Sequence, residues 1–139
     1  MEKTINAKYA FISEKDQGGK SFEKATMINT GSKKMGIFGF DTEVSDKQYY
    51  KIKVDKEELV KLQFTKNESF SNTDTLRVDV YKSNNKSTPI TWGWIFENQS
   101  KGTLYIRNSE NHKTKKGTYY IVVSKVYDTS GFTYSVKRE

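Results

Sequence analysis

The pattern of apolar and polar residues predicts β-strands along most of the chain. Several short segments carry an apolar side chain at every second position. The clearest of these sets are Tyr50, Ile52 and Val54; Val60, Leu62 and Phe64; and Leu76, Val78 and Val80. Because successive side chains of a strand point to opposite faces, a period of two indicates one buried face and one solvated face. We therefore expect these three segments to be half-buried strands.

Further strands are expected at 4–13, 35–40, 90–96 and 103–107. The glycines within 35–40 indicate a bulged or edge strand. No segment shows a helical period of useful length. About eight or nine short strands at regular intervals are typical of β-sandwiches, so the expected fold is all-β, a single antiparallel sandwich of the jelly-roll kind.

The C-terminal part of the chain predicts a β-hairpin. Residues 119–123 are dense in β-branched and aromatic side chains, 128–131 supply turn residues, and 132–136 resume the alternation. One face of both strands is expected in the core. Its members are Tyr119, Ile121, Val123, Phe132, Tyr134 and Val136.

The chain has 139 residues, a length that fits one domain. We divide it into an N-terminal strand and linker loop at 1–20 and a β-sandwich binding domain at 21–139. An aromatic content of 14% is too high for a disordered chain. There is no cysteine, which excludes thiol catalysis, thiolate metal sites and disulfides.

The net charge is +7, from 24 Lys and Arg against 17 Asp and Glu, so anionic material is attracted without specificity. The basic residues are scattered, which does not favour a nucleic-acid partner. No apolar run follows Met1, and none is long enough to span a bilayer. We expect a secreted or cell-surface protein whose signal peptide has been removed, a monomer with an extracellular protein or polysaccharide as its ligand.

The sequence offers no catalytic constellation. His112, the one histidine, lies in a polar, turn-like segment, and no serine or cysteine is identifiable as its partner. A phosphate-binding glycine loop and the HExxH metal motif are both absent. The chain is therefore expected not to be an enzyme.

The two tryptophans lie two residues apart, at Trp92 and Trp94, and so on the same face of one predicted strand. Ile90 and Phe96 share their parity, which is compatible with an inward, core-forming row. The alternative is an outward row that stacks on a ligand. Tyr105 also alternates with charged residues and would extend such a surface.

Three segments together resemble the bacterial pre-peptidase C-terminal domain family, and within it the collagen-binding domains of clostridial collagenases. They are SFEKAT at 21–26, SDKQYYKIKV at 45–54, and GTYYIVV at 117–123 followed by SGFTYSV at 130–136. Their order and spacing agree with the family, so the resemblance covers 21–138. It implies a compact β-sandwich without catalytic residues that serves as a binding or accessory domain of a secreted bacterial protein.

The resemblance also implies candidate binding residues. Trp92 and Trp94 fall on the strand that contacts the ligand in the collagen-binding relatives, and Lys125 matches a lysine of a neighbouring strand. The tyrosines that flank this lysine there are replaced here, although Tyr127 could supply a displaced ring. A matrix protein such as collagen is therefore one expected ligand. A carbohydrate-binding module of similar architecture is the alternative.

Those relatives also bind calcium through acidic residues in the N-terminal linker and before the Tyr-Tyr pair. Gln48 stands where they place an aspartate directly before that pair. The remaining acids near these two segments are Glu14, Asp16, Asp41, Glu43 and Asp46. Because calcium takes six to eight oxygen ligands, we expect no cofactor, with a calcium site as the alternative.

Overall fold

The computed structural model describes residues 16–39, 42–43, 45–69, 74–96, 98–107, 111–127 and 131–139. The strand expected at 4–13 lies outside these ranges, as do Glu14 and Asp41. Within the described part of the chain, no helix has the length and apolar character that crossing a bilayer requires.

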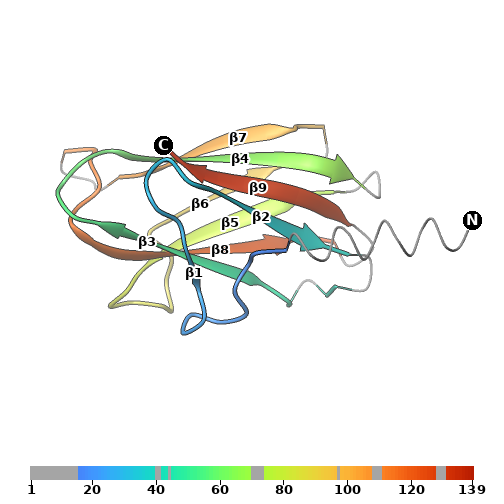
Figure 1. Cartoon of the computed structure of the whole chain (residues 1–139), viewed down its shortest axis with the longest axis horizontal. Helices are drawn as coiled ribbons and strands as arrows, with labels where there is room; N and C mark the ends of the chain where they lie inside the picture. Colours follow the sequence, from blue (N-terminus) through green and yellow to red (C-terminus); the bar gives the residue numbers. More distant parts are fainter. Residues whose placement is uncertain are drawn as a thin grey trace, which may run out of the picture.

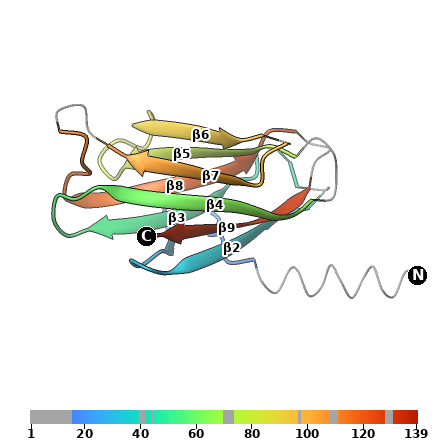
Figure 2. The same ribbon diagram turned by 90° about the horizontal axis from the view of Figure 1, so that it is seen from above.

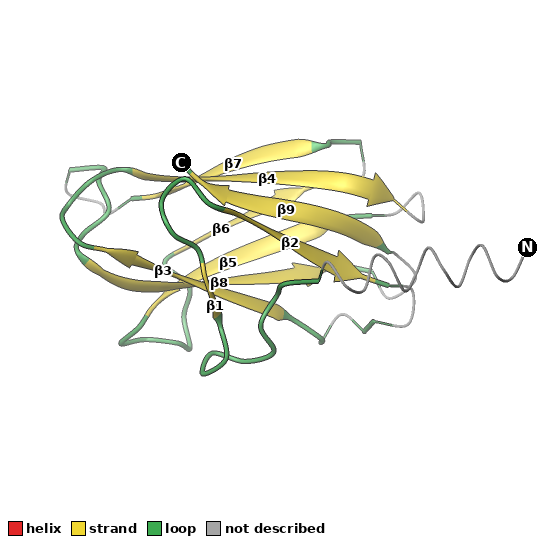
Figure 3. Ribbon diagram, in the orientation of Figure 1, coloured by secondary structure: helices red, strands yellow, loops and turns green. Residues whose placement is uncertain are grey.

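Two β-sheets pack face to face and run along the long axis of the molecule (Figures 1 and 2). Among the described residues, nine strands and no helix are present (Figure 3). The strands are β1 (Thr26–Met27), β2 (Lys33–Phe38), β3 (Gln48–Val54), β4 (Val60–Ser69), β5 (Leu76–Lys82), β6 (Thr91–Ile95), β7 (Lys101–Ile106), β8 (Gly117–Lys125) and β9 (Phe132–Arg138). One sheet has the order β1-β3-β8-β5-β6, and the other has the order β2-β9-β4-β7. The expected all-β sandwich is confirmed.

The core lies between the two sheets and is built from alternate residues of their strands. Every strand pair is antiparallel except β1 with β3, which is parallel. The apolar sets read from the period of two in β3, β4, β5, β8 and β9 are all buried. These include the six residues expected in the core of β8 and β9, each at most 3% exposed.

The expected C-terminal hairpin is wrong. β8 pairs with β3 and β5, whereas β9 pairs with β2 and β4 in the opposite sheet. Both strands turn their apolar faces toward the core, but from opposite sides. Alternation cannot distinguish these arrangements, because a strand buries the same residues whether its neighbour lies beside it or across the core. Among the described strands, β5 and β6 are the only consecutive pair hydrogen-bonded to each other.

The end of the segment expected as a linker loop belongs to the sandwich. The Gln17 amide donates to the Met35 carbonyl at 2.7 Å, and Gly19 exchanges backbone hydrogen bonds with Tyr49 at 2.9 and 3.1 Å. Residues 16–19 therefore bridge β2 of one sheet and β3 of the other.

Candidate functional site

The tryptophans of β6 lie on the outer face of the five-stranded sheet. Trp92 is 52% exposed and Trp94 is 41% exposed, so the outward reading of this row holds and the core reading does not. Gly93 between them points inward, where a Cβ would lie 3.5 Å from Leu104 of β7. The strand alternation thus places both indoles on the surface of an edge strand.

A fixed ion pair on β5 lies beside the indoles. Strand register places Arg77 opposite Trp94 and Asp79 opposite Trp92. Arg77 donates two hydrogen bonds to the carboxylate of Asp79, from Nε at 3.0 Å and from the terminal nitrogen at 3.2 Å. Its guanidinium carbon lies 5.3 Å from the centroid of the Trp94 ring, within cation-π range. Hydrogen bonding of Arg77 to the Asp79 carboxylate is the main cause that raises the pKa of Arg77.

Two further apolar side chains join the tryptophans. Phe96 directly follows β6 and Val126 directly follows β8, and both are exposed. Both lie near the start of β5. The Val126 amide donates to the carbonyl of Thr75, and Phe96 follows Ile95, which pairs with Leu76. We call Trp92, Trp94, Phe96 and Val126 the tryptophan patch. An exposed apolar group of this kind, next to an arginine, has the composition of a protein-binding hot spot.

The other three candidate binding residues, Lys125, Tyr127 and Tyr105, lie outside the tryptophan patch. Lys125 is 1% exposed, and its Nζ donates to the Gly39 carbonyl at 3.1 Å. The prediction that it lies on the binding surface is therefore wrong. Lys125 shares the inward parity of Ile121 and Val123. Tyr127 is exposed next to Val126. Tyr105 is exposed on β7 of the other sheet, where Arg107 lies 4.5 Å from its ring centroid.

An aromatic cluster around Phe22 of the N-terminal segment lies on another part of the same outer face. Phe22 packs edge-on against three tyrosines, with centroid distances of 4.9 Å to Tyr49, 5.7 Å to Tyr81 and 5.2 Å to Tyr120. Lys86 lies above this group, 5.7 Å from the Phe22 ring and 5.2 Å from the Tyr120 ring. Phe22 thus packs over residues of β3, β5 and β8, whereas the tryptophan patch is centred on β6.

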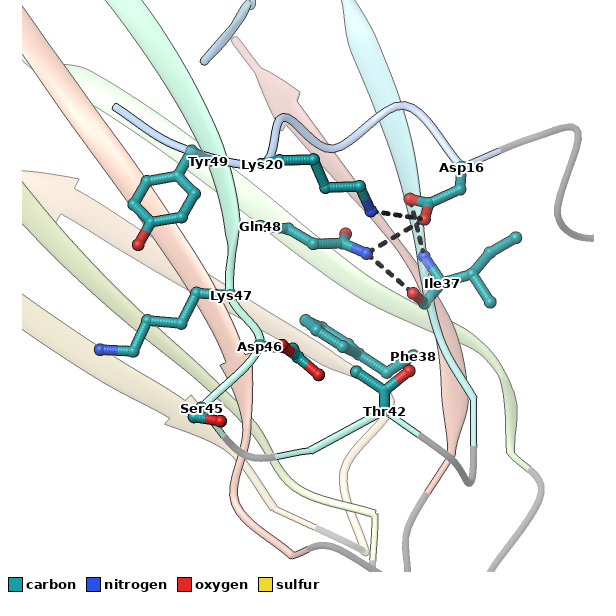
Figure 4. A pocket seen from close by; sticks show the side chains of 10 residues that line it. All are labelled: Asp16, Lys20, Ile37, Phe38, Thr42, Ser45, Asp46, Lys47, Gln48 and Tyr49. Atoms are coloured by element: carbon teal, nitrogen blue, oxygen red, sulfur yellow. Dashed lines mark hydrogen bonds and ion pairs between the residues drawn. The ribbon is translucent and has the colours of Figure 1, made fainter. Parts of the chain in front are cut away.

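A second candidate is a polar pocket of about 380 Å³ between the N-terminal segment and β3 (Figure 4). Asp16, Lys20 and Gln48 point toward one another in it. The Asp16 carboxylate accepts hydrogen bonds from the amides of Gly18 at 3.4 Å and Ile37 at 3.3 Å, and from Gln48 Nε2 at 3.3 Å. Lys20 Nζ lies 4.0 Å from it. Burial is the main cause that raises the pKa of Asp16.

Gln48 connects this pocket to the core. Its Nε2 also donates to the Ile37 carbonyl at 2.8 Å, and its Oε1 accepts a hydrogen bond from the Tyr134 hydroxyl. Tyr134 shares a further hydrogen bond of 2.8 Å with the Tyr50 hydroxyl. Burial raises the pKa of both tyrosines above the ordinary range, which keeps these hydroxyls protonated as donors. The network ties β2, β3 and β9 together.

The described residues of this pocket do not fit a calcium ion. They place no group of three acidic, histidine or cysteine side chains together. Asp16 is surrounded by nitrogen donors, while Asp46 accepts from the Glu43 amide within its own loop at 3.1 Å. Calcium needs six to eight oxygens. In this pocket, which we call the Asp16 clamp, backbone and side-chain amides and the Lys20 ammonium group instead surround and stabilise the one carboxylate of Asp16.

We expect calcium and EDTA to leave the melting temperature unchanged, because a ligand raises it only by binding the folded state. Differential scanning fluorimetry in calcium, in magnesium and in EDTA measures this. A rise that calcium causes and magnesium does not would contradict the clamp reading.

Several solved structures share this fold. The pre-peptidase C-terminal domain of a collagenase from Bacillus anthracis superposes with a TM-score of 0.58 at 15% identity, over 83% of this chain and 94% of that one. The surface-associated copper-binding protein CorA of Methylomicrobium album gives 0.53 at 9% identity, over 83% and 97%. The periplasmic lysozyme inhibitor PliG of Aeromonas hydrophila gives 0.51 at 10%, over 83% and 96%. At these identities the likeness shows the fold alone. No protein-family model matches the sequence, and no curated protein matches it significantly.

The sequence analysis missed the two polar features of the sites. Gln48 shares the parity of Tyr50, Ile52 and Val54, so alternation alone would have placed it inward. The Arg77 and Asp79 pair carried no comparable signal, because its position beside the indoles depends on the register between β5 and β6.

Proposed function

We propose that this chain is a non-catalytic binding or accessory domain of a secreted or surface-attached bacterial protein. The tryptophan patch, with Arg77 beside it, binds an extracellular protein ligand, of which a matrix protein such as collagen is one example. The single observation that carries the proposal is the exposure of Trp92 and Trp94 on the outer face of a sheet edge. A folded domain that leaves two neighbouring indoles in water has a use for them in binding.

The chemistry of the patch favours a protein over other ligands. Trp and Arg dominate binding hot spots, because they bury large areas and also supply directional contacts. Arg77 is held by Asp79, so it loses little side-chain freedom when a ligand arrives. The fold of the collagenase domain from Bacillus anthracis supports an accessory role, and the periplasmic and surface locations of the other two proteins support export. Flat exposed indoles also stack on sugar rings, which makes a polysaccharide the second candidate.

The expected result is that Trp92→Ala and Trp94→Ala each weaken ligand binding by roughly tenfold or more, as hot-spot truncations do. The melting temperature should stay close to that of the wild type, because both side chains are exposed. Pull-down with fibrillar collagen and binding to a glycan array separate the two ligand classes. Tyr105→Ala is the matched control, since it removes an exposed aromatic ring from the other sheet.

Iodide quenching of tryptophan fluorescence tests the starting observation independently. Strong quenching, with emission close to that of free indole, is expected. Protected, blue-shifted emission would contradict the exposed patch. If Tyr105→Ala weakens ligand binding and neither tryptophan variant does, the binding site lies on the other sheet.

A further inference from the structure

The free edge of β6 lacks the features that normally protect a sheet edge. Four strands form the edges of the two sheets: β1, β6, β2 and β7. β1 has two residues, β2 begins with Lys33 and Lys34, and β7 begins with Lys101. β6 reads TWGWI, with no charge, no proline and no shift in its register with β5. Protected edges are short, charged, bulged or interrupted by proline, so β6 is open to pairing.

A small apolar slot opens at the same edge, on the inner side of β6. It has a volume of about 30 Å³ and lies between β6 and β7, which are not hydrogen-bonded to each other. Two glycines make room for it, Gly93 on β6 and Gly102 on β7. The walls include Phe64, Val78, Trp94, Ile95 and Leu104. A side chain that enters from the edge would thus reach apolar core residues.

We infer that the ligand of the tryptophan patch binds as an added β-strand beside β6, a refinement that rests on the proposed function above. Side chains of an added strand alternate between the two faces of the sheet. One set would pack on Trp92 and Trp94, and the other would point toward the slot at Gly93. The edge thus fits an extended protein segment in which apolar side chains that pack on the tryptophans alternate with small side chains that face the slot.

Charge complementarity defines the segment further. The patch is bordered by Arg77 on β5, opposite Trp94, and the whole chain carries a net charge of +7. The one acid on the described strands next to the patch, Asp79, is already bound to Arg77. The partner is therefore a segment with acidic residues beside its apolar positions. A proline-rich rod such as collagen does not meet this description, because proline lacks the amide donor that strand pairing needs. Among the protein ligands that the proposed function allows, the inference therefore selects a segment other than collagen.

Selection of a random dodecapeptide phage library on the wild-type protein tests the inference. Peptides with apolar residues at a period of two, acidic flanks and no internal proline are expected. In the best peptide, N-methylation at alternate positions should weaken binding by roughly tenfold or more, and at the intervening positions much less, because alternate amides face β6. Gly93→Ala should also weaken binding without lowering the melting temperature, because its Cβ enters the slot.

The outcomes separate this inference from the proposed function. Equal effects of N-methylation at both parities, or proline-rich selected peptides, would overturn strand addition, while loss of binding in Trp92→Ala would still support the patch as the site. Failure to select any peptide overturns strand addition as well. Sedimentation that shows a dimer in the wild type, and a monomer in the Trp94→Lys variant, would assign the edge to a second copy of the chain and overturn the inference.

Discussion

Gln48→Glu is expected to lower the free energy of unfolding by about 3 to 5 kcal/mol at neutral pH, the usual cost of an uncompensated buried charge. Glu keeps the shape of Gln but replaces the amide nitrogen with an oxygen. That nitrogen donates to the Ile37 carbonyl at 2.8 Å and to the Asp16 carboxylate at 3.3 Å. Both hydrogen bonds would become repulsive oxygen contacts at a side chain that is 4% exposed.

The loss should shrink as the solution is acidified. Burial already raises the pKa of Asp16, and a second carboxylate at hydrogen-bond distance raises it further, because two like charges this close cannot both ionise. The folded-state pKa of the pair then lies above the unfolded value. The variant therefore loses stability as the pH rises through that pKa, and recovers toward about pH 3, which lies below the unfolded pKa values of both carboxyl groups, so that both states are largely protonated. Urea unfolding across this range measures the slope.

Gln63→Glu is the matched control. Gln63 lies half-exposed on the outer face of β4, opposite Thr103 and Lys137, so the same change of charge meets water and a lysine. Its effect should stay within about 0.5 kcal/mol. An equal loss in both variants, or a Gln48→Glu protein that becomes more stable as the pH rises, would show that the Gln48 amide is not a required donor.

The period of two predicted which residues are buried, but it could not predict how the strands pair. Tyr119, Ile121 and Val123 of β8 and Phe132, Tyr134 and Val136 of β9 are all in the core as expected. Their strands nevertheless belong to different sheets. Burial is a local property of one strand and its core-facing parity, whereas pairing depends on distant segments that compete for the same edge.

The same distinction explains the outcome at the site. Lys125 follows the inward parity of Val123, and the structure places it inward, while the family resemblance had placed it on the surface. Trp92 and Trp94 had two readings because an aromatic row at strand spacing suits either the core or a ligand. In the structure Gly93 faces inward, toward Leu104. The tryptophans on either side of it therefore face outward, and the core-forming interpretation is wrong.

Gly36→Ala is expected to lower the free energy of unfolding by about 1 to 3 kcal/mol, because the added methyl group crowds the hydrogen-bonded side chains of Gln48 and Tyr134 between the two sheets. Gly36 is a buried residue of β2, opposite Tyr134 of β9. A Cβ there would lie 2.2 Å from Gln48 Oε1 and 2.3 Å from the Tyr134 hydroxyl. Neither group can move away cheaply. Gln48 is held by Asp16 and the Ile37 carbonyl, and Tyr134 is fully buried and bonded to Tyr50.

Gly93→Ala supplies the control for this effect, since it introduces the same methyl group into another strand. Its Cβ meets only Leu104, at the ordinary contact distance of 3.5 Å, so the free energy of unfolding should change by about 0.5 kcal/mol or less. Urea unfolding of both variants at one pH gives the comparison. If Gly36→Ala costs no more than Gly93→Ala, the close approach of β2 to Gln48 and Tyr134 is not required for stability, and the network around Gln48 does not hold the two sheets together.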